Sequence, residues 1–313
     1  MNIRLNTTPL LSATALMLLI SSIHGATTEP KPFVQMSEPE IAVAVKTIHD
    51  SNPSLTSRVE AVSAGFLGTP YRLGPLGEGP TGKFDQDPLV DFRAADCTTF
   101  VEQVMALSLE PDLKRALILL QNIRYKDGII SYETRNHFTE VDWISNNSTA
   151  GYLEDITRRV AGSQTGVATK TISKHDWYAK KTLDDLKDFP GSPSEKELLL
   201  TRFRALGERM PDQKAALPYI PTELFSQFLK EIPSGSIINL VRQDMPDKPV
   251  IISHQALIVQ KHDGPFIRHA HASAQVEDMP AAEYFHRYEG SKWPLLGVNV
   301  NRISQKASPH EKE

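Results

Sequence analysis

The stretch "AADCTTFVEQV", residues 94–104, contains Cys97, the single cysteine of the 313-residue sequence. Asp96 and two threonines surround Cys97, and apolar residues at helical spacing follow, so we expect Cys97 at the N-terminus of a helix. The partial positive charge of a helix N-terminus favours the thiolate, which is the nucleophilic form of cysteine. A buried and inert cysteine is the alternative, because free cysteine also packs as a small apolar side chain.

A thiol nucleophile needs a base, and histidines in the strand-like C-terminal part of the sequence are the candidates. His254 lies in "VIISHQALIVQ", an apolar run that predicts a strand. His269 and His271 lie in the next such segment, "PFIRHAHAS", on one common face. A polar group on that face could bond the distal nitrogen of His254 and fix its tautomer. Strand periodicity does not separate His269 from His271.

The same segments allow a metal hypothesis, because His-x-His on a strand can bind zinc. However, His262 lies in a predicted turn, and no carboxylate stands at ligand spacing beside the other histidines. We therefore expect neither a metal nor an organic cofactor.

The elements that must position these residues are helices in the first part of the sequence and strands in the last part. Helical spacing predicts helices at 37–50, 54–68, from Cys97 onward and at 112–124. Apolar runs separated by turns predict antiparallel strands at 235–241, 250–260, 265–273 and 297–303. This order is typical of the α+β class.

Two connecting segments shape the site. Residues 68–97 are dense in Gly, Pro and Asp, which predicts an ordered loop that leads to the nucleophile. Asp96 or a neighbouring threonine can cap the helix that follows, and Thr99 with Glu102 fits a capping box. The stretch 124–147 predicts a hairpin about an Asp-Gly turn.

The first 26 residues predict a signal peptide: a single charged side chain, Arg4, precedes an apolar run and closing small residues. The apolar run is too short for a membrane span, which needs about 20 residues. We therefore expect an exported, periplasmic protein without stable membrane insertion. Residues 27–313 are interpreted as one domain, in which the charged stretch from about 150 to 230 forms a helical insertion.

Composition and net charge limit the classes of molecule that the protein could bind. With 40% hydrophobic and 23% charged residues, the sequence is that of an ordinary globular protein. The formal net charge of −4 provides no basic field, so we expect no nucleic-acid binding. We expect a monomer.

Five motifs resemble the NlpC-type cysteine amidases, papain-like enzymes that cut bacterial cell-wall peptides. They are "FLGTPYRLG", "DCTTFVEQV", "GSIINLV", "SHQALIV" and "IRHAHAS", in the order of that superfamily. The resemblance implies a papain-like core in which Cys97 is the nucleophile and His254 the base. It makes Tyr71 the loop tyrosine that helps to hold the oxyanion, while Ala256 replaces the usual glycine after the base.

A narrower resemblance is to the N-acetylmuramoyl-L-alanine amidase-like family. It rests on "YRLGPLGEG", "FRAADCTTFVEQVMAL" and "IRYKDGIISYETRNHFTEVDWISNN", and it is weakest between about 150 and 230. The family register favours His269 over His271 as the third catalytic residue. The implied reaction is hydrolysis of the amide that joins N-acetylmuramic acid to L-alanine in peptidoglycan fragments. Muropeptides with a 1,6-anhydro sugar end are the expected substrates.

The resemblance also implies substrate-binding residues. The segment "RNHFTEVDW" would contribute Asn136, His137 and Trp143 to a sugar or peptide pocket, with Trp143 stacked on a sugar ring and Asn136 bonded to an acetamido group. Glu78 and Arg135 would read charged peptide termini. A packed loop without contact to substrate is the alternative for this segment.

Three other functions compete with the amidase. An endopeptidase of the same superfamily would cut between γ-D-glutamate and diaminopimelate. A non-catalytic protein with this fold would only bind the cell wall. A zinc amidase would lose its activity with a chelator but not with iodoacetamide.

Overall fold

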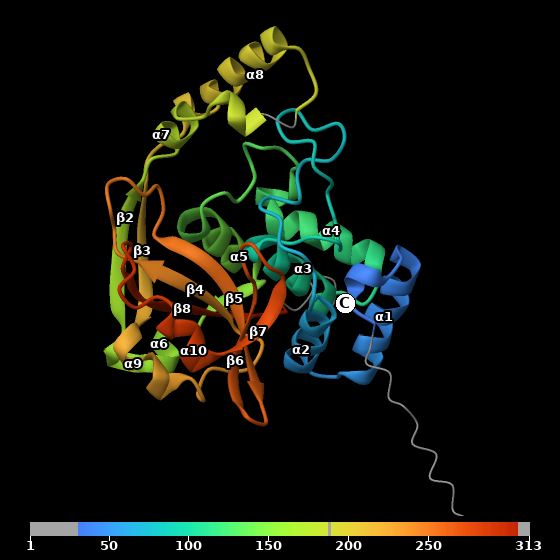
Figure 1. The fold of residues 1–313 in the computed structure, drawn as a ribbon, viewed down its shortest axis with the longest axis vertical. Helices are drawn as coiled ribbons and strands as arrows, with labels where there is room; N and C mark the ends of the chain where they lie inside the picture. The colour runs from blue at the N-terminus through green and yellow to red at the C-terminus, as the bar shows by residue number, and fades with distance from the viewer. Residues whose placement is uncertain (1–30, 187–188, 306–313) are drawn as a thin grey trace, which may run out of the picture. The chain divides into compact units, whose positions relative to one another are not determined.

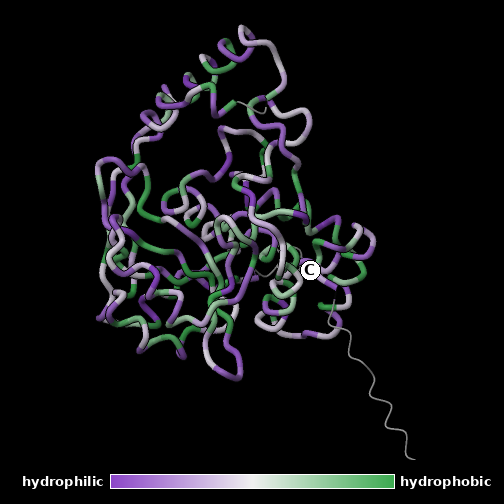
Figure 2. The backbone as a smooth tube through the Cα atoms, viewed as in Figure 1, coloured by the Kyte–Doolittle hydropathy of each residue, from purple (hydrophilic) through white to green (hydrophobic). Residues whose placement is uncertain are grey.

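The computed structural model describes residues 31–186 and 189–305, which belong to one compact unit. The predicted signal peptide lies outside the described residues. Within them, no helix combines the length and apolar character needed to cross a lipid bilayer. Figure 2 agrees, since hydrophobic and hydrophilic residues are interspersed along the described chain.

Helices occupy the N-terminal part of the chain, as predicted (Figure 1). They are α1 (Glu38–Ser51), α2 (Leu55–Gly65), α3 (Cys97–Leu109) and α4 (Leu113–Arg124). Each begins at a capping residue: Ser37, whose capping box with Glu40 is formed, then Ser54, Asp96 and Asp112. Capping side chains bond backbone N–H groups that have no partner within the helix, and this explains why local sequence located these starts.

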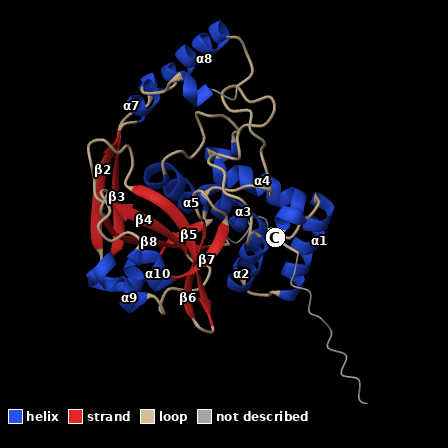
Figure 3. Ribbon diagram, viewed as in Figure 1, coloured by secondary structure: helices blue, strands red, loops and turns tan. Residues whose placement is uncertain are grey.

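An antiparallel sheet of eight strands forms the rest of the fold (Figure 3). The strands are β1 (Leu153–Asp155), β2 (Gly166–Ile172), β3 (Gln213–Pro221), β4 (Ile237–Arg242), β5 (Ile252–Lys261), β6 (Gly264–Ala270), β7 (Val276–Pro280) and β8 (Leu295–Ile303). Their order is β2-β3-β8-β4-β5-β6-β7, with β1 beside β8. The four predicted strands correspond to β4, β5, β6 and β8, and the α+β prediction is confirmed.

The insertion differs from its prediction, because it adds strands as well as helices. β2 pairs with β3 along its whole length, and β3 pairs with β8, so this hairpin extends the sheet. Between β2 and β3 lie α7 (Lys174–Ala179) and α8 (Pro193–Ala205). Phe203 of α8 stacks on Phe84 at 5.0 Å between ring centroids and thereby ties the insertion to the loop that precedes Cys97. The shorter helices are α5 (Ile144–Ala150), α6 (Thr157–Ala161), α9 (Thr222–Phe228) and α10 (Ala281–His286).

The predicted hairpin at 124–147 is wrong, although its turn forms. Asp127 and Gly128 have φ angles of 55° and 68°, as an Asp-Gly turn requires. Only an isolated bridge, between Tyr125 and Arg135, follows. The chain then enters the π-helical turn Thr139–Trp143. The reason is tertiary, since this turn buries Trp143, and Phe138 just before it is buried as well.

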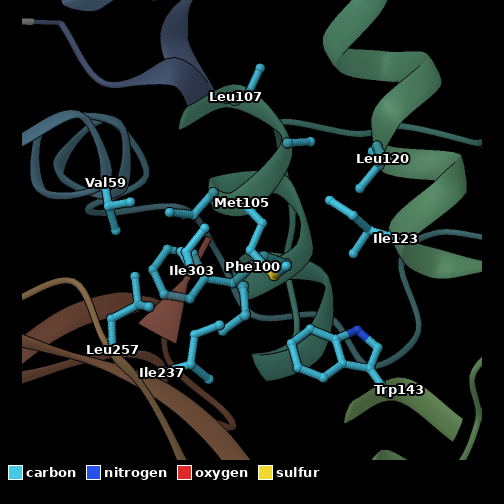
Figure 4. Close-up of a cluster of buried hydrophobic side chains, with 14 of the residues drawn as sticks. Val59, Phe100, Met105, Leu107, Leu120, Ile123, Trp143, Ile237, Leu257 and Ile303 are labelled. Carbon is cyan, nitrogen blue, oxygen red and sulfur yellow. The ribbon is translucent and has the colours of Figure 1, made fainter. Parts of the chain in front are cut away.

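Alternation along the strands buries both faces of the sheet. Leu257 of β5 and Ile237 of β4 pack with helical residues such as Phe100 and Val59, as Figure 4 shows. Ala256, the neighbour of Leu257, belongs to a second cluster with residues of α9 and α10. The helix that begins at Cys97 therefore lies against a sheet that is packed on both faces.

Candidate active site

Asp96 caps the helix that carries Cys97. Its Oδ1 accepts hydrogen bonds from the backbone N–H and the hydroxyl of Thr99, both at 2.8 Å, and the Thr99 hydroxyl oxygen accepts from the Asp96 N–H at 2.9 Å. The capping box therefore joins Asp96 to Thr99, and the expected pairing of Thr99 with Glu102 is wrong. Since Asp96 is the N-cap, Glu102 falls on the next turn, where it is buried.

The loop around Tyr71 is bonded to the start of the nucleophile helix. The other carboxylate oxygen of Asp96 accepts from the Gly74 N–H at 2.9 Å. The backbone of residues 70–72 exchanges hydrogen bonds with Ala95 on one side, and the Tyr71 N–H donates to the Ala274 carbonyl on the other. Burial and the nearby charges of Cys97 and Asp96 raise the pKa of Tyr71 to about 12, so the phenol keeps its proton as a donor.

His254 and His269 form the pair that the sequence suggested. His254 Nε2 lies 3.1 Å from His269 Nδ1. A register shift between β4 and β5, next to His254, interrupts the regular ladder at this point, and such bulges re-aim side chains. The pairing leaves His254 Nδ1 as the ring nitrogen available to a nucleophile.

His271 lies beside His269, with 5.4 Å between ring centroids, but it has other hydrogen-bond partners. β6 ends at Ala270, so His271 no longer follows the alternation of the strand. Its Nδ1 lies 2.8 Å from Glu277 Oε1, and its Nε2 lies 2.8 Å from an Arg287 nitrogen. His269 alone bonds His254 among the described residues.

Cys97 lies at the start of α3, which packs against β5, the strand that carries His254. The backbone N–H of Gln255, the residue after His254, acts on the sulfur to lower the pKa of Cys97, and the hydroxyl of Thr98 lies 3.9 Å from the sulfur. Both contacts favour the thiolate. Nevertheless, burial and the charge of Asp96 raise the pKa of Cys97 to about 11, although part of the side chain remains exposed. The expectation of a thiolate stabilised by the helix end is therefore wrong for the resting protein.

The histidines are shifted in the opposite direction. Burial lowers the pKa of His254 to about 4 and that of His269 to about 3, because the interior disfavours the charged imidazolium. Near neutral pH the site thus holds a thiol and two neutral imidazoles. A neutral imidazole can accept a proton, so His254 retains the capacity of a general base.

Trp143 does not have the position that the resemblance implied. Its side chain is fully buried, and its Nε1 donates to Glu102 at 3.1 Å. Figure 4 shows it in the same apolar cluster as Phe100 and Ile123. A fully buried indole offers no face to a sugar ring, so the stacking role is wrong, and Trp143 is a core residue.

The carboxylate of Glu78 and the amide of Asn136 are likewise committed to internal contacts. Glu78 accepts three backbone hydrogen bonds at 2.9–3.0 Å, from Phe84, Asp85 and Tyr132. Asn136 donates to the Ile123 carbonyl and accepts from Asn146. These contacts hold the loops together and use the polar atoms that were expected to read the substrate.

Arg135 and His137 also bond within the protein. Arg135 forms an ion pair with Asp85 at 2.7 Å, and His137 Nε2 lies 2.8 Å from the Tyr132 carbonyl. Burial lowers the pKa of His137 well below its ordinary value. Both residues line a cavity of about 370 Å³, together with Asn136. No contact of these side chains in the described structure joins them to the Cys97 centre.

The chain can now be compared with known proteins. Residues 61–291 match the family model of AmiA-like, N-acetylmuramoyl-L-alanine amidase-like proteins. The chain belongs to this family. A crystal structure of a Legionella pneumophila protein is 30% identical, with a TM-score of 0.78, over 85% of this chain and 95% of that one. Among curated proteins, no relative matches.

A second member of the comparison shares the fold. It is the crystal structure of an N-acetylmuramoyl-L-alanine amidase from Bacteroides uniformis, which is 21% identical, with a TM-score of 0.59. The alignment covers 80% of this chain and 99% of that one. The uncovered part of this chain is therefore additional to the amidase architecture of that neighbour.

Sequence reasoning missed a polar ladder that crosses the sheet beneath the site. Gln255 Nε2 donates to Asn239 Oδ1, and Asn239 Nδ2 donates to Asn299 Oδ1, each at 3.0 Å. The three residues are cross-strand neighbours on β5, β4 and β8. Amides at buried strand positions were the available signal, because they need partners there. The ladder fixes Gln255, whose N–H contacts the sulfur.

Proposed function

We propose that this family member is a cysteine amidase that hydrolyses the bond between N-acetylmuramic acid and L-alanine in peptidoglycan fragments. Membership of the amidase-like family supports the reaction class. The observations that support the cysteine mechanism are that Gln255, the residue after His254, acts on the Cys97 sulfur, and that His254 Nε2 lies 3.1 Å from His269 Nδ1.

The first half of the reaction forms a thioester. The Cys97 proton passes to His254 Nδ1 as the sulfur attacks the carbonyl carbon of the lactyl amide. The resulting oxyanion accepts hydrogen bonds from the Tyr71 hydroxyl and from free backbone N–H groups at the start of α3. The tetrahedral intermediate then collapses, and His254 gives its proton to the departing amino group of L-alanine.

The second half releases the sugar acid. His254, neutral again, takes a proton from water while the water oxygen attacks the thioester carbonyl. Collapse of this second intermediate breaks the bond to sulfur and restores the Cys97 thiol. His269 accepts the hydrogen bond of His254 Nε2 throughout and keeps the ring oriented. The raised pKa of Cys97 makes a free thiolate scarce near neutral pH, which favours proton transfer that accompanies attack.

Several finer features belong to the same proposal. The core is of the NlpC-type, papain-like kind, and the protein is a periplasmic monomer that is exported by its N-terminal signal peptide. The substrates are muropeptides with a 1,6-anhydro end. The order of the motifs and the placement of Cys97 at a helix start support the core assignment, and the charge and apolar pattern of the first 26 residues of the sequence supports export.

Purified protein and defined anhydro-muropeptides test the proposal, with mass spectrometry of the products. We expect free stem peptide that begins with L-alanine, together with the intact sugar. We expect no product from Cys97→Ala, and inhibition by iodoacetamide but not by a chelator. A shortened stem would instead identify the endopeptidase. Full activity of Cys97→Ala would refute the cysteine mechanism.

A further inference from the structure

One ring nitrogen in the proposed site has no partner. His269 Nε2 is buried, and no hydrogen-bonding atom lies within reach of it in the described part of the chain. Buried polar groups in proteins are generally bonded, so an unpaired one next to a reaction centre requires an explanation.

The tautomer of the two histidines makes this nitrogen important. For His254 Nδ1 to accept the thiol proton, the neutral His254 ring must carry its hydrogen on Nε2 and donate it to His269 Nδ1. His269 must then carry its own hydrogen on Nε2, the unpaired atom. In the reverse arrangement His269 Nδ1 donates, and His254 carries a hydrogen on Nδ1, where it cannot act as a base. An acceptor at His269 Nε2 would therefore select the productive arrangement.

Glu277 lies where such an acceptor is needed. It stands directly opposite His269 in the pairing of β6 with β7. Its Oε1 is 3.9 Å from His269 Nε2, which is about 1 Å too long for a hydrogen bond. The edge-on ring of Tyr284, at 4.8 Å between centroids, is the competing and weaker acceptor.

His271 and Arg287 hold the Glu277 carboxylate in this place. Arg287 has only donors, so His271 Nε2 must accept from it. His271 Nδ1 then carries the hydrogen and donates to Glu277 Oε1 at 2.8 Å. The hydrogen bonds therefore run from Arg287, which follows α10, through His271 to Glu277 of β7, and the carboxylate can still accept another hydrogen bond.

We propose that Glu277 is a positioning residue of the amidase site, which accepts the His269 Nε2–H and so keeps His254 Nδ1 free for the Cys97 proton. A movement of the carboxylate by about 1 Å completes the bond. The negative charge also balances the imidazolium that forms on His254 during attack. This inference rests on the proposed function, because it assigns His254 as the base.

The test uses the full chain with ¹⁵N-labelled histidine, in the wild type and in Glu277→Gln. Nitrogen chemical shifts report which ring nitrogen carries the hydrogen, without any turnover. We expect His269 and His254 to be Nε2–H tautomers in the wild type and mixed tautomers in Glu277→Gln. Wild-type tautomers in Glu277→Gln would overturn the inference and point to the Tyr284 ring.

Kinetics on the muropeptide give a second readout. We expect kcat of Glu277→Gln to fall at least about tenfold with KM nearly unchanged, since the wrong tautomer removes the base and not the substrate contacts. Glu277→Asp, which keeps the charge, should recover part of kcat, and it also serves if the glutamine variant fails to fold. Glu283→Gln on the same face of the fold, an exposed residue of α10, is the control that should change nothing. An unchanged kcat in Glu277→Gln would refute the role, whereas an inactive wild type with the expected tautomers would refute only the proposed function.

Discussion

The buried ion pair between α3 and α4 offers a quantitative test of how the nucleophile helix is held. Glu102 Oε2 lies 2.8 Å from an Arg124 nitrogen, and the two side chains are 3% and 2% exposed. Glu102 also accepts from the Trp143 indole, and Arg124 donates to the Leu76 carbonyl in the loop that leads to Cys97. We consider Glu102→Leu, which removes the carboxylate and leaves both donors in place.

The expected cost follows from what remains buried. An uncompensated Arg124 charge costs about 3–5 kcal/mol in a protein interior. The unpaired Trp143 N–H adds about 1–3 kcal/mol, the cost of a buried donor without an acceptor, so the total is about 4–8 kcal/mol. A protein whose total stability is about 5–15 kcal/mol would then be close to unfolding at ordinary temperature.

Urea unfolding of the single variants and of Glu102→Leu/Arg124→Met measures the effect. We expect the free energy of unfolding of the double variant to exceed that of Glu102→Leu by about 2 kcal/mol or more, since the double variant also removes the unpaired Arg124 charge. The exposed pair Lys46–Asp50, 2.7 Å apart with side chains 68% and 63% exposed, provides the control. Asp50→Ala should cost less than about 1 kcal/mol. The reasoning is refuted if Glu102→Leu lowers the free energy of unfolding as little as Asp50→Ala does, or if the double variant is less stable than Glu102→Leu.

Three further outcomes are expected. Iodoacetamide should label Cys97 slowly at neutral pH and faster as the pH rises towards about 11. Asp96→Asn, which keeps the helix cap, should shift the pH dependence of labelling to lower pH. A labelling rate that levels off below pH 7 in the wild type would contradict the raised pKa of Cys97. Folding lowers the pKa of His254 from 6.5 to about 4, so the unfolded chain binds more protons than the folded chain between these pH values. The free energy of unfolding should therefore fall as the pH drops from 6.5 to 4 and stay level above 6.5. Urea titrations at several pH values measure this dependence. Gly297→Ala should cost at least about 2 kcal/mol in thermal unfolding because its Cβ would overlap the Ile220 carbonyl, whereas Gly68→Ala, with open space but a φ of 81°, should cost about 1–2 kcal/mol.

Local chemistry explains what could be predicted. Asp96 and Thr99 are three residues apart, so the start of the Cys97 helix is a property of a short segment. The same holds for the apolar run of β5, which placed His254 on a strand. Hydrogen bonds within a few residues, and periodicity along one element, are legible in any sequence that contains them.

Burial is not local, and it accounts for the wrong predictions. Trp143 and Glu78 have residue types suited to sugars and peptide termini, but contacts with segments far along the chain enclose the first and use the carboxylate of the second. The same burial reversed the expected pKa shift of Cys97, because loss of water outweighs the helix N-terminus. Residue type therefore suggested substrate contacts for side chains that the tertiary structure uses for internal packing and hydrogen bonds.

The sequence by itself indicated a candidate nucleophile and a candidate base, and it located the capped helix and the strand that carry them, because each element depends on neighbours in the chain. Only the tertiary structure decided that His269 bonds His254 while His271 turns to Glu277. Two histidines on one strand face are equivalent until the strand ends and a neighbouring strand and helix supply their partners.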